Sequence, residues 1–498
     1  MNRNKEKNQV GQSPHHNRRW KILAFLSLAQ LMVVLDATIV NIALPSAQAD
    51  LGFGDADRQW IITAYALAFG SLLLLGGRLA DYLGRKRTLI VGLFGFAGAS
   101  AIGGLAPSFE VLVGARALQG MFGALLAPSA LSTLTTTFTE PSERAKAFGV
   151  YGALAGGGGA VGLLLGGLLT EYLDWRWTMF VNVAFAIPAG IGLAALLVND
   201  PRRDEVRVDI PGAIAASTGL FGIVFGFSRA EADGWTAAVT LASLAAGVAL
   251  LALFILIERR SDAPLLPLRV VADRNRAGSY LAVGVAGASM FGVFLFLTYY
   301  LQQTLGMSPI ETGLAFLPMI AFLMVGSISS STKLMPRFGP RPLVPTGMVL
   351  AAAGMVWLTG VGVDSTYAGA VLPGLALVGA GFGLIIAPSM ASATLGVAVS
   401  DSGVASAMVN TSQQVGGSVG TALLSTISAS AVTAFASGKV PGPELAAQAA
   451  VHGYTTAFWV AAAVLAAGAV VTAITLRSGA PQAEGDQAEG EGSLAMAH

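Results

Sequence analysis

The chain has 498 residues, of which 54% are hydrophobic and 11% are charged, and its formal net charge is +1. About a quarter of the residues of a typical soluble domain are charged, so this composition excludes an ordinary soluble protein and indicates a membrane protein. The chain contains no cysteine, which excludes disulfide bonds, thiol catalysis and cysteine-bound metals. Its four histidines lie in the tails or near a helix end without metal-binding spacing, so we expect neither a metal nor a cofactor. Its cations are spread over many loops, and we expect no nucleic-acid partner.

Fourteen apolar segments are long enough to cross about 30 Å of hydrocarbon. Their approximate bounds are residues 22–45, 60–79, 88–106, 109–133, 147–169, 177–198, 211–229, 235–257, 278–301, 312–331, 343–362, 367–390, 403–428 and 454–476. The first resembles a signal peptide, but its apolar run of about 24 residues exceeds the usual 7–15, and Asp36 interrupts it. We therefore predict that it is retained as a span.

Lysine and arginine predict the orientation. If the amino terminus is cytoplasmic, 24 of the 29 lysines and arginines lie in cytoplasmic tails and loops. The outer loops then contain only Arg58, Arg176, Arg229 and Lys439, and Arg116 lies inside a span. The positive-inside rule thus predicts a multi-pass protein of the cell membrane with both termini in the cytoplasm.

The short loop between the second and third predicted spans, residues 76–87, reads GGRLADYLGRKR. Its acidic and basic side chains lie within salt-bridge reach at a helix end. The pattern resembles the signature loop between helices 2 and 3 of the major facilitator superfamily, although a plain positive-inside loop is an alternative. The resemblance implies a latch between the two halves of a transporter, formed by Gly77, Asp81, Gly84, Arg85 and Lys86.

An internal repeat divides the chain. The sequence FGALLAPS at 122–129 matches FGLIIAPS at 382–389, an offset of 260 residues. Parallel repeats of this kind are related by an axis along the membrane normal. The predicted fold is therefore an all-α integral membrane protein with 14 transmembrane helices, in which two six-helix bundles are related by pseudo-twofold symmetry and a helix pair is inserted. The predicted parts are a cytoplasmic tail (1–21), the first bundle (22–198), the inserted pair with its cytoplasmic links (199–276), the second bundle (277–477) and a disordered cytoplasmic tail (478–498).

Asp36 is the acidic residue that the sequence places within the hydrocarbon core. A carboxylate there costs about 2.5–3.5 kcal/mol, so it must face a cavity, find a partner or be protonated. The surrounding sequence LDATIVNIALP, which includes Asn41, resembles the first-helix signature of the fourteen-helix drug:proton antiporters. This resemblance implicates Asp36 in proton coupling or cation recognition, whereas a structural ion pair is the alternative.

Arg116 is the expected partner of Asp36, because both residues lie roughly 12 Å below the outer membrane boundary. The sequence RALQG at 116–120 resembles the fourth-helix motif of the superfamily. The resemblance implies that Arg116 assists proton transfer and adds Gln119 to the candidate site. Helix packing without a transport role is the alternative.

Four glycines of the fifth predicted span, Gly158, Gly162, Gly166 and Gly167, resemble the antiporter motif G-x-x-x-G-P-x-x-G-G. Leu163 replaces its proline, which leaves open whether coupling is altered. The glycines allow close helix contact, and small-residue packing without antiport is the alternative.

Uncharged polar residues and aromatic residues within the spans would suit a cavity for amphiphilic compounds. The polar set is Gln30, Asn41, Asn182, Asn410, Gln413 and Gln414, and the aromatic set is Phe291, Phe294, Phe296, Tyr299 and Tyr300. Packing between helices or against lipid is an alternative for each aromatic residue. Because spans 9–14 have no acidic residue away from their ends, we predict a preference for neutral or monocationic substrates over dications.

The resemblance implies a proton-coupled antiporter that exports small amphiphilic drugs or antibiotics by alternating access, and we expect it to be a monomer in the bilayer. An exporter of a dedicated metabolite or lipid-like compound is an alternative with the same fold. A proton-translocating respiratory subunit also has about fourteen helices, but such subunits resemble one another in carrying midplane lysines, and all seven lysines here lie in tails, loops or helix ends. No nucleophile, metal or acid–base cluster is evident, so we predict that the protein is not an enzyme.

Overall fold

The computed structural model describes residues 18–55, 57–138, 140–198, 209–262, 264–395, 397 and 401–477, and these residues contain helices and no strand. The predicted tail 478–498 and most of the tail 1–21 lie outside these ranges. Fourteen long helices of the described chain correspond one to one with the predicted spans. They are α2 (Arg19–Leu51), α3 (Gln59–Leu83), α4 (Arg85–Gly104), α5 (Phe109–Thr137), α6 (Pro141–Tyr172), α7 (Trp177–Leu196), α8 (Ile210–Asp233), α9 (Ala238–Arg260), α11 (Arg274–Tyr299), α12 (Pro309–Ser329), α14 (Pro340–Leu358), α15 (Leu372–Thr394), α16 (Ser402–Ala436) and α17 (Pro443–Thr475).

Thirteen helices in the described ranges are apolar and long enough to cross a membrane. The fourteenth long helix is α6, which has 32 residues. Short elements connect or extend the long ones, namely α10 (Leu268–Ala272), α13 (Met335–Phe338) and the π-helical turns η2 (Tyr300–Thr304), η3 (Ser330–Leu334) and η4 (Tyr367–Val371). The predicted all-α membrane fold is confirmed.

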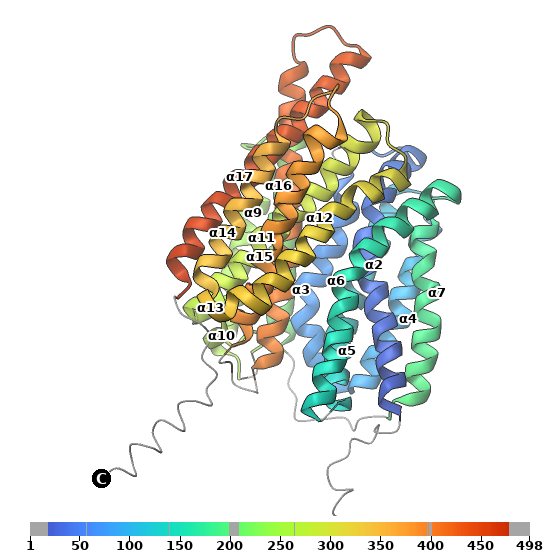
Figure 1. Ribbon diagram of the computed structural model, residues 1–498, viewed down its shortest axis with the longest axis vertical. Helices are drawn as coiled ribbons and strands as arrows, with labels where there is room; N and C mark the ends of the chain where they lie inside the picture. The colour runs from blue at the N-terminus through green and yellow to red at the C-terminus, as the bar shows by residue number, and fades with distance from the viewer. Residues whose placement is uncertain are drawn as a thin grey trace, which may run out of the picture.

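The packing of the long helices repeats itself. In the first group α2 packs on α6 and α7, α3 on α5, and α4 on α5 and α7 (Figure 1). In the second group α11 packs on α16 and α17, α12 on α15, and α14 on α15 and α17. Each pair in one group has its counterpart in the other when α2 is matched with α11, which is the pseudo-twofold relation expected from the 260-residue offset.

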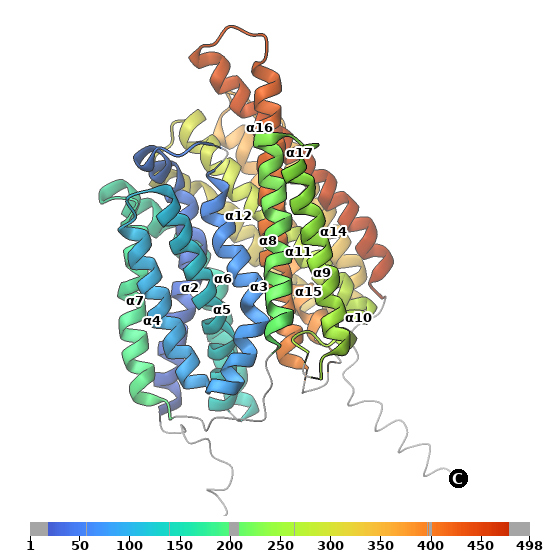
Figure 2. The same cartoon turned by 180° about the vertical axis from the view of Figure 1, so that it is seen from behind.

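The two six-helix bundles meet along a seam with two symmetric halves, formed by α3 against α16 and by α6 against α12. The inserted pair covers only one half of this seam. Its helix α8 packs on both α3 and α16, while α9 packs on α8 (Figure 2). The inserted pair therefore contacts both bundles from outside rather than separating them.

The described chain starts and ends at the same end of the molecule, where α2 begins and α17 ends (Figure 1). We call this the terminal end and the other the opposite end. Helices α16 and α17 continue past the predicted limits of their spans and form a hairpin that projects from the opposite end. Alanine is the strongest helix former, and these extensions are rich in it, so the helices continue where the apolar segments stop.

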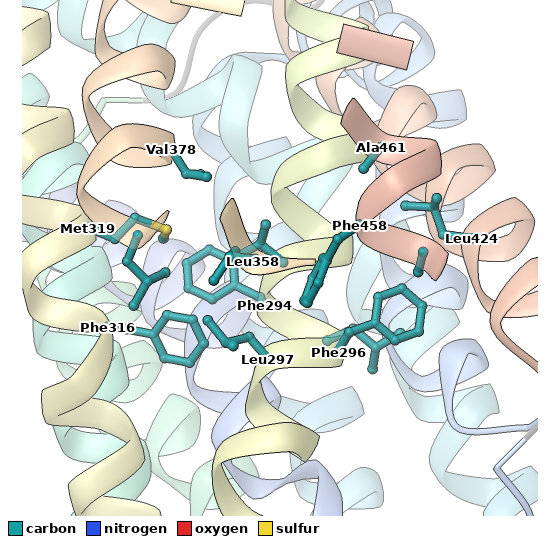
Figure 3. Packing of buried hydrophobic residues seen from close by; sticks show 14 of the residues in the cluster. Phe294, Phe296, Leu297, Phe316, Met319, Leu358, Val378, Leu424, Phe458 and Ala461 are labelled. Carbon is teal, nitrogen blue, oxygen red and sulfur yellow. The ribbon is translucent and has the colours of Figure 1, made fainter. Parts of the chain in front are cut away.

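Aromatic side chains fill the interior of the second bundle (Figure 3). The rings of Phe294 and Phe316 lie 5.1 Å apart, and those of Phe296 and Phe458 lie 6.4 Å apart. All four side chains are buried. Phe294 and Phe296 thus serve helix packing, which was the alternative to a role in lining a cavity.

Candidate functional site

Asp36 and Arg116 form an ion pair inside the first bundle. Arg116 Nη1 donates to Asp36 Oδ2 over 2.6 Å, and the two side chains are 2% and 0% exposed. Asp36 lies on α2 and Arg116 on α5, so the contact ties two helices together. The expected pairing from equal membrane depth agrees with this geometry.

Two amide side chains complete the surroundings of the carboxylate. Gln119 Nε2 and Asn182 Nδ2 both donate to Asp36 Oδ1, over 2.9 and 2.7 Å. Both amides also donate to the hydroxyl of Ser100, over 2.6 and 3.3 Å. Arg116 and Gln119 share one face of α5 because three residues separate them. Asp36 therefore accepts three hydrogen bonds from α5 and α7, with α4 supplying Ser100.

Helix α3 encloses the guanidinium. Arg116 Nε donates to the carbonyl of Ile61 over 3.0 Å, and its Cζ lies 4.4 Å from the centroid of the Tyr65 ring. A buried charge is tolerated only where a partner and hydrogen bonds compensate its desolvation. Here the carboxylate of Asp36 accepts three hydrogen bonds, one of them from the guanidinium, and these compensate its desolvation.

The group faces the interior of the first bundle, because its partners come from α3, α4, α5 and α7. Asn41, also expected at the site, lies elsewhere. Its Nδ2 donates to the carbonyl of Ala37 over 3.0 Å within its own helix. The structure thus brings Asp36, Arg116 and Gln119 together and leaves Asn41 outside the group.

The four expected glycines lie where α6 crosses its neighbours. A Cβ at Gly158 would lie 3.0 Å from Val34 of α2, and one at Gly162 would overlap the Thr38 hydroxyl. A Cβ at Gly166 would lie 3.0 Å from the carbonyl of Ile39, while one at Gly167 would lie 2.6 Å from the Cα of Ile310 on α12. The glycines therefore allow α6 to approach α2 within the bundle and α12 across the seam.

The predicted latch lies at the terminal end. Gly84 has φ +94°, a conformation that favours glycine, and it separates α3 from α4. Lys86 Nζ donates to the carbonyl of Leu197 over 2.6 Å, a contact within the first bundle. Arg85 is half-buried, Gly77 lies beside Pro128, and the side chain of Asp81 lies outside what the structure describes.

A second group of contacts joins the two bundles near the opposite end. The Cζ of Arg58 lies 4.1 Å from the ring centroid of Tyr299 and 5.8 Å from that of Tyr454, and Arg58 is 6% exposed. Tyr299 also donates its hydroxyl to Gln48 Oε1 over 2.5 Å. Gln302 Nε2 donates to the carbonyl of Ile42 over 3.0 Å. We call these residues the opposite-end contacts.

Sequence reasoning missed several of these residues. Arg58 was only an outer-loop cation, and Asn182 was only a polar residue of a predicted cavity. Ser100 and Tyr65 gave no signal, because a lone hydroxyl in an apolar span does not reveal which way it points. Arg176, predicted only as an outer-loop cation, pairs with Asp50 of α2 over 2.5 Å.

The chain is similar to a known family and to several known proteins. The family model described as Major Facilitator Superfamily matches residues 26–421. Puromycin resistance protein pur8 of Streptomyces alboniger is 50% identical over 93% of this chain and 92% of its own. Cephamycin export protein CmcT of Amycolatopsis lactamdurans is 40% identical over 82% and 85% of the two chains. Multidrug efflux pump LfrA of Mycolicibacterium smegmatis is 34% identical over 82% and 81%.

Solved structures with the same fold are more distant in sequence. An inward-facing, unoccupied bacterial homologue of the human lysosomal transporter Spinster superposes with a TM-score of 0.63 at 17% identity, covering 93% of this chain and 98% of that one. The transporter PepTSo gives a TM-score of 0.66 at 15% identity, with 91% and 97% covered. These likenesses concern the fold alone.

Proposed function

The chain belongs to the Major Facilitator Superfamily, and from this membership we propose that it is a proton-coupled antiporter that exports small amphiphilic drugs or antibiotics by alternating access. It is a multi-pass membrane transporter and not an enzyme. The relatives named for puromycin resistance, cephamycin export and multidrug efflux support a drug-like cargo.

The observation that carries proton coupling is the buried, fully hydrogen-bonded carboxylate of Asp36. Intramembrane ionisable residues with a partner are typical of proton relays in pumps and transporters. Protonation removes the charge that attracts Arg116, Gln119 and Asn182, so the ionised and protonated forms favour different helix arrangements. A proton that binds in one conformation and leaves in another supplies the driving force for export.

Alternating access is supported by the position of the contacts between the bundles. The opposite-end contacts and the bond that the Ile310 amide donates to Glu171 join the two bundles at the opposite end. We place the terminal end in the cytoplasm of a cell whose plasma membrane the protein spans, because the positive-inside rule assigns most cations to that side. A cargo would then enter from the cytoplasm in this conformation and leave after these contacts separate.

The test is proton-driven transport in everted membrane vesicles, with a compound panel that starts with puromycin. Wild-type protein should accumulate a panel compound only while the proton gradient persists, and Asp36→Asn should abolish this accumulation at equal membrane insertion. Asp50→Asn is the matched control, because Asp50 lies on the same helix in a surface ion pair of small energetic weight. Gradient-driven accumulation at wild-type rate by Asp36→Asn would remove Asp36 from the mechanism.

An exporter dedicated to one metabolite is the second candidate function. The relative named a cephamycin export protein favours it. The same vesicle panel separates the two functions, because a drug exporter accumulates several unrelated amphiphiles and a dedicated exporter accumulates one chemical class.

A further inference from the structure

An apolar groove lies on the second bundle where α11, α16 and α17 converge. Its volume is about 560 Å³, within the range of about 300–1,000 Å³ that small-molecule sites occupy. Leu424 and Ala461, both labelled in Figure 3, lie on its α16 and α17 walls. Aliphatic and small side chains line nearly all of it. The only side chains with oxygen among its lining residues are Tyr280, Ser289 and Ser412.

Small residues pack closely where α11 meets α16 at the floor of the groove. A Cβ at Gly416 would overlap the backbone of Gly284, and one at Gly420 would overlap Ala288. These helices already touch through their backbones, so the groove cannot close by moving α11 toward α16. It is a fixed hollow rather than a gap that packing would fill.

The groove begins near the terminal end and reaches past the middle of the membrane. At 1.5 Å rise per residue, Leu281 lies about 10 Å from the start of α11 at Arg274. Val464 of α17 lies about 16 Å from the end of that helix at Thr475. The α11 wall of the groove runs from Tyr280 to Ser289, about 14 Å, which is close to the roughly 15 Å that a hydrocarbon chain of one lipid leaflet spans.

Arginines lie at the terminal ends of the same helices. Arg274 occupies the face of α11 that lines the groove, because Leu281, Val285 and Ala288 follow it by 7, 11 and 14 residues. Arg274 is exposed, and its Nη2 donates to the carbonyl of Ile474 on α17.

Two further arginines surround the end of α17. Arg341 Nε donates to the carbonyl of Ala473 over 3.1 Å, and the backbone amide of Arg477 donates to Asn275 Oδ1 over 2.8 Å. Both arginines are exposed. A guanidinium has five N–H donors, so the contact that Arg274 makes with a helix carbonyl uses only part of its capacity.

We propose that the groove and the three arginines form a binding site for an anionic phospholipid. The phosphate binds the guanidinium groups of Arg274, Arg341 and Arg477, and one acyl chain lies in the groove. Arginine matches phosphate geometry through paired N–H donors, and basic pockets between transmembrane helices bind anionic headgroups. The apolar lining excludes a charged occupant from the groove itself, while the arginines around the end of α17 favour an anionic headgroup over a zwitterionic one. This site is independent of the proton pathway.

The test measures lipid binding to the purified full-length protein by native mass spectrometry. Dioleoyl phosphatidylglycerol and dioleoyl phosphatidylcholine share the same chains and differ in headgroup charge. We expect the wild-type protein to retain the phosphatidylglycerol preferentially. Arg274→Gln should weaken that binding roughly fivefold, the equivalent of about 1 kcal/mol per basic residue, and Arg274→Lys should weaken it less.

Matched variants separate a lipid site from general effects. Val464→Phe fills the groove and should weaken binding of phosphatidylglycerol, whereas Val470→Phe on the 61% exposed lipid-facing side of α17 should not. Arg259→Gln, at the end of α9, controls for loss of any surface charge. Equal retention of the two lipids by the wild type, or equal effects of Val464→Phe and Val470→Phe, would overturn the proposal. So would an Arg274→Gln variant that binds phosphatidylglycerol normally but unfolds at a lower temperature, since the arginine would then only cap α17.

Discussion

Removing Arg116 while leaving Asp36 in place tests the energetics of the buried pair directly. Loss of one partner of a buried ion pair costs about 3–5 kcal/mol, because the other charge stays desolvated. In Arg116→Gln, Asp36 keeps its bonds from Gln119 and Asn182, at 2.9 and 2.7 Å. Each bond to a charged group is worth about 1.5–3 kcal/mol. We therefore expect a loss of about 3 kcal/mol, the lower end of the range.

The double variant Asp36→Asn/Arg116→Gln has no charge left to compensate. Its loss should be smaller than the sum of the two single losses by about 2 kcal/mol, within the range of about 0.5–3 kcal/mol found for residues in contact. Equilibrium unfolding of the purified protein in mixed micelles would measure all four proteins of the cycle.

The pair between Asp50 and Arg176 is a matched control in the same protein. It also joins an aspartate of α2 to an arginine, over 2.5 Å, but its side chains are 45% and 29% exposed. The cycle with Asp50→Asn and Arg176→Gln should give a coupling below about 1 kcal/mol. Additive losses at Asp36 and Arg116, or equal couplings in the two cycles, would refute the reasoning that burial gives this pair its strength.

Three further predictions concern the transport cycle. Arg58→Ala should weaken the opposite-end contacts and so increase the labelling of a cysteine introduced at position 48 by a thiol reagent. The chain has no other cysteine that the reagent could label. Equal labelling of Gln48→Cys proteins with and without Arg58→Ala would exclude Arg58 from closure. Asp81→Asn or Arg85→Ala should slow cycling without changing substrate affinity, since both positions lie at the terminal end; a lost affinity at normal cycling rate would contradict the latch. Matched mono- and bis-quaternary compounds should show better export of the monocation, because Arg116 already offsets the charge of Asp36, and equal export of both would contradict this preference.

Sequence patterns predicted the helices well because each depends on local information. Hydrophobic length is a property of one segment, and each of the fourteen predicted spans corresponds to one long helix. The pair of Asp36 and Arg116 was also predictable, because two opposite charges at equal depth in hydrocarbon have few other partners. Charged residues are rare in the hydrocarbon core because burying a charge is costly, so the two that occur there can be paired with each other.

The remaining contacts depend on rotation of helices about their axes, which hydrophobic length does not specify. Asn182 and Ser100 are uncharged, so their burial in an apolar span imposes no unique partner. Arg58 lies in a loop, where a cation satisfies the positive-inside rule at little cost, and its partners Tyr299 and Tyr454 come from the other half of the chain. Contacts between the halves therefore required the assembled structure.

Helix α2 connects the proposed proton site to the seam through two different faces. Asp36 faces α5 and α7, while Thr38 faces Gly162 of α6. Two residues correspond to about 200° around a helix, so these faces are nearly opposite. Because the glycines let α6 lie directly against Val34, Thr38 and Ile39 of α2, we expect a rotation or shift of α2 that follows loss of the Asp36 charge to displace α6. Gly167 would transfer that displacement to α12 of the second bundle, because a Cβ at Gly167 would lie only 2.6 Å from the Cα of Ile310. We therefore expect a charge change in the interior of the first bundle to reach the seam through the close contacts of α6 with α2 and α12.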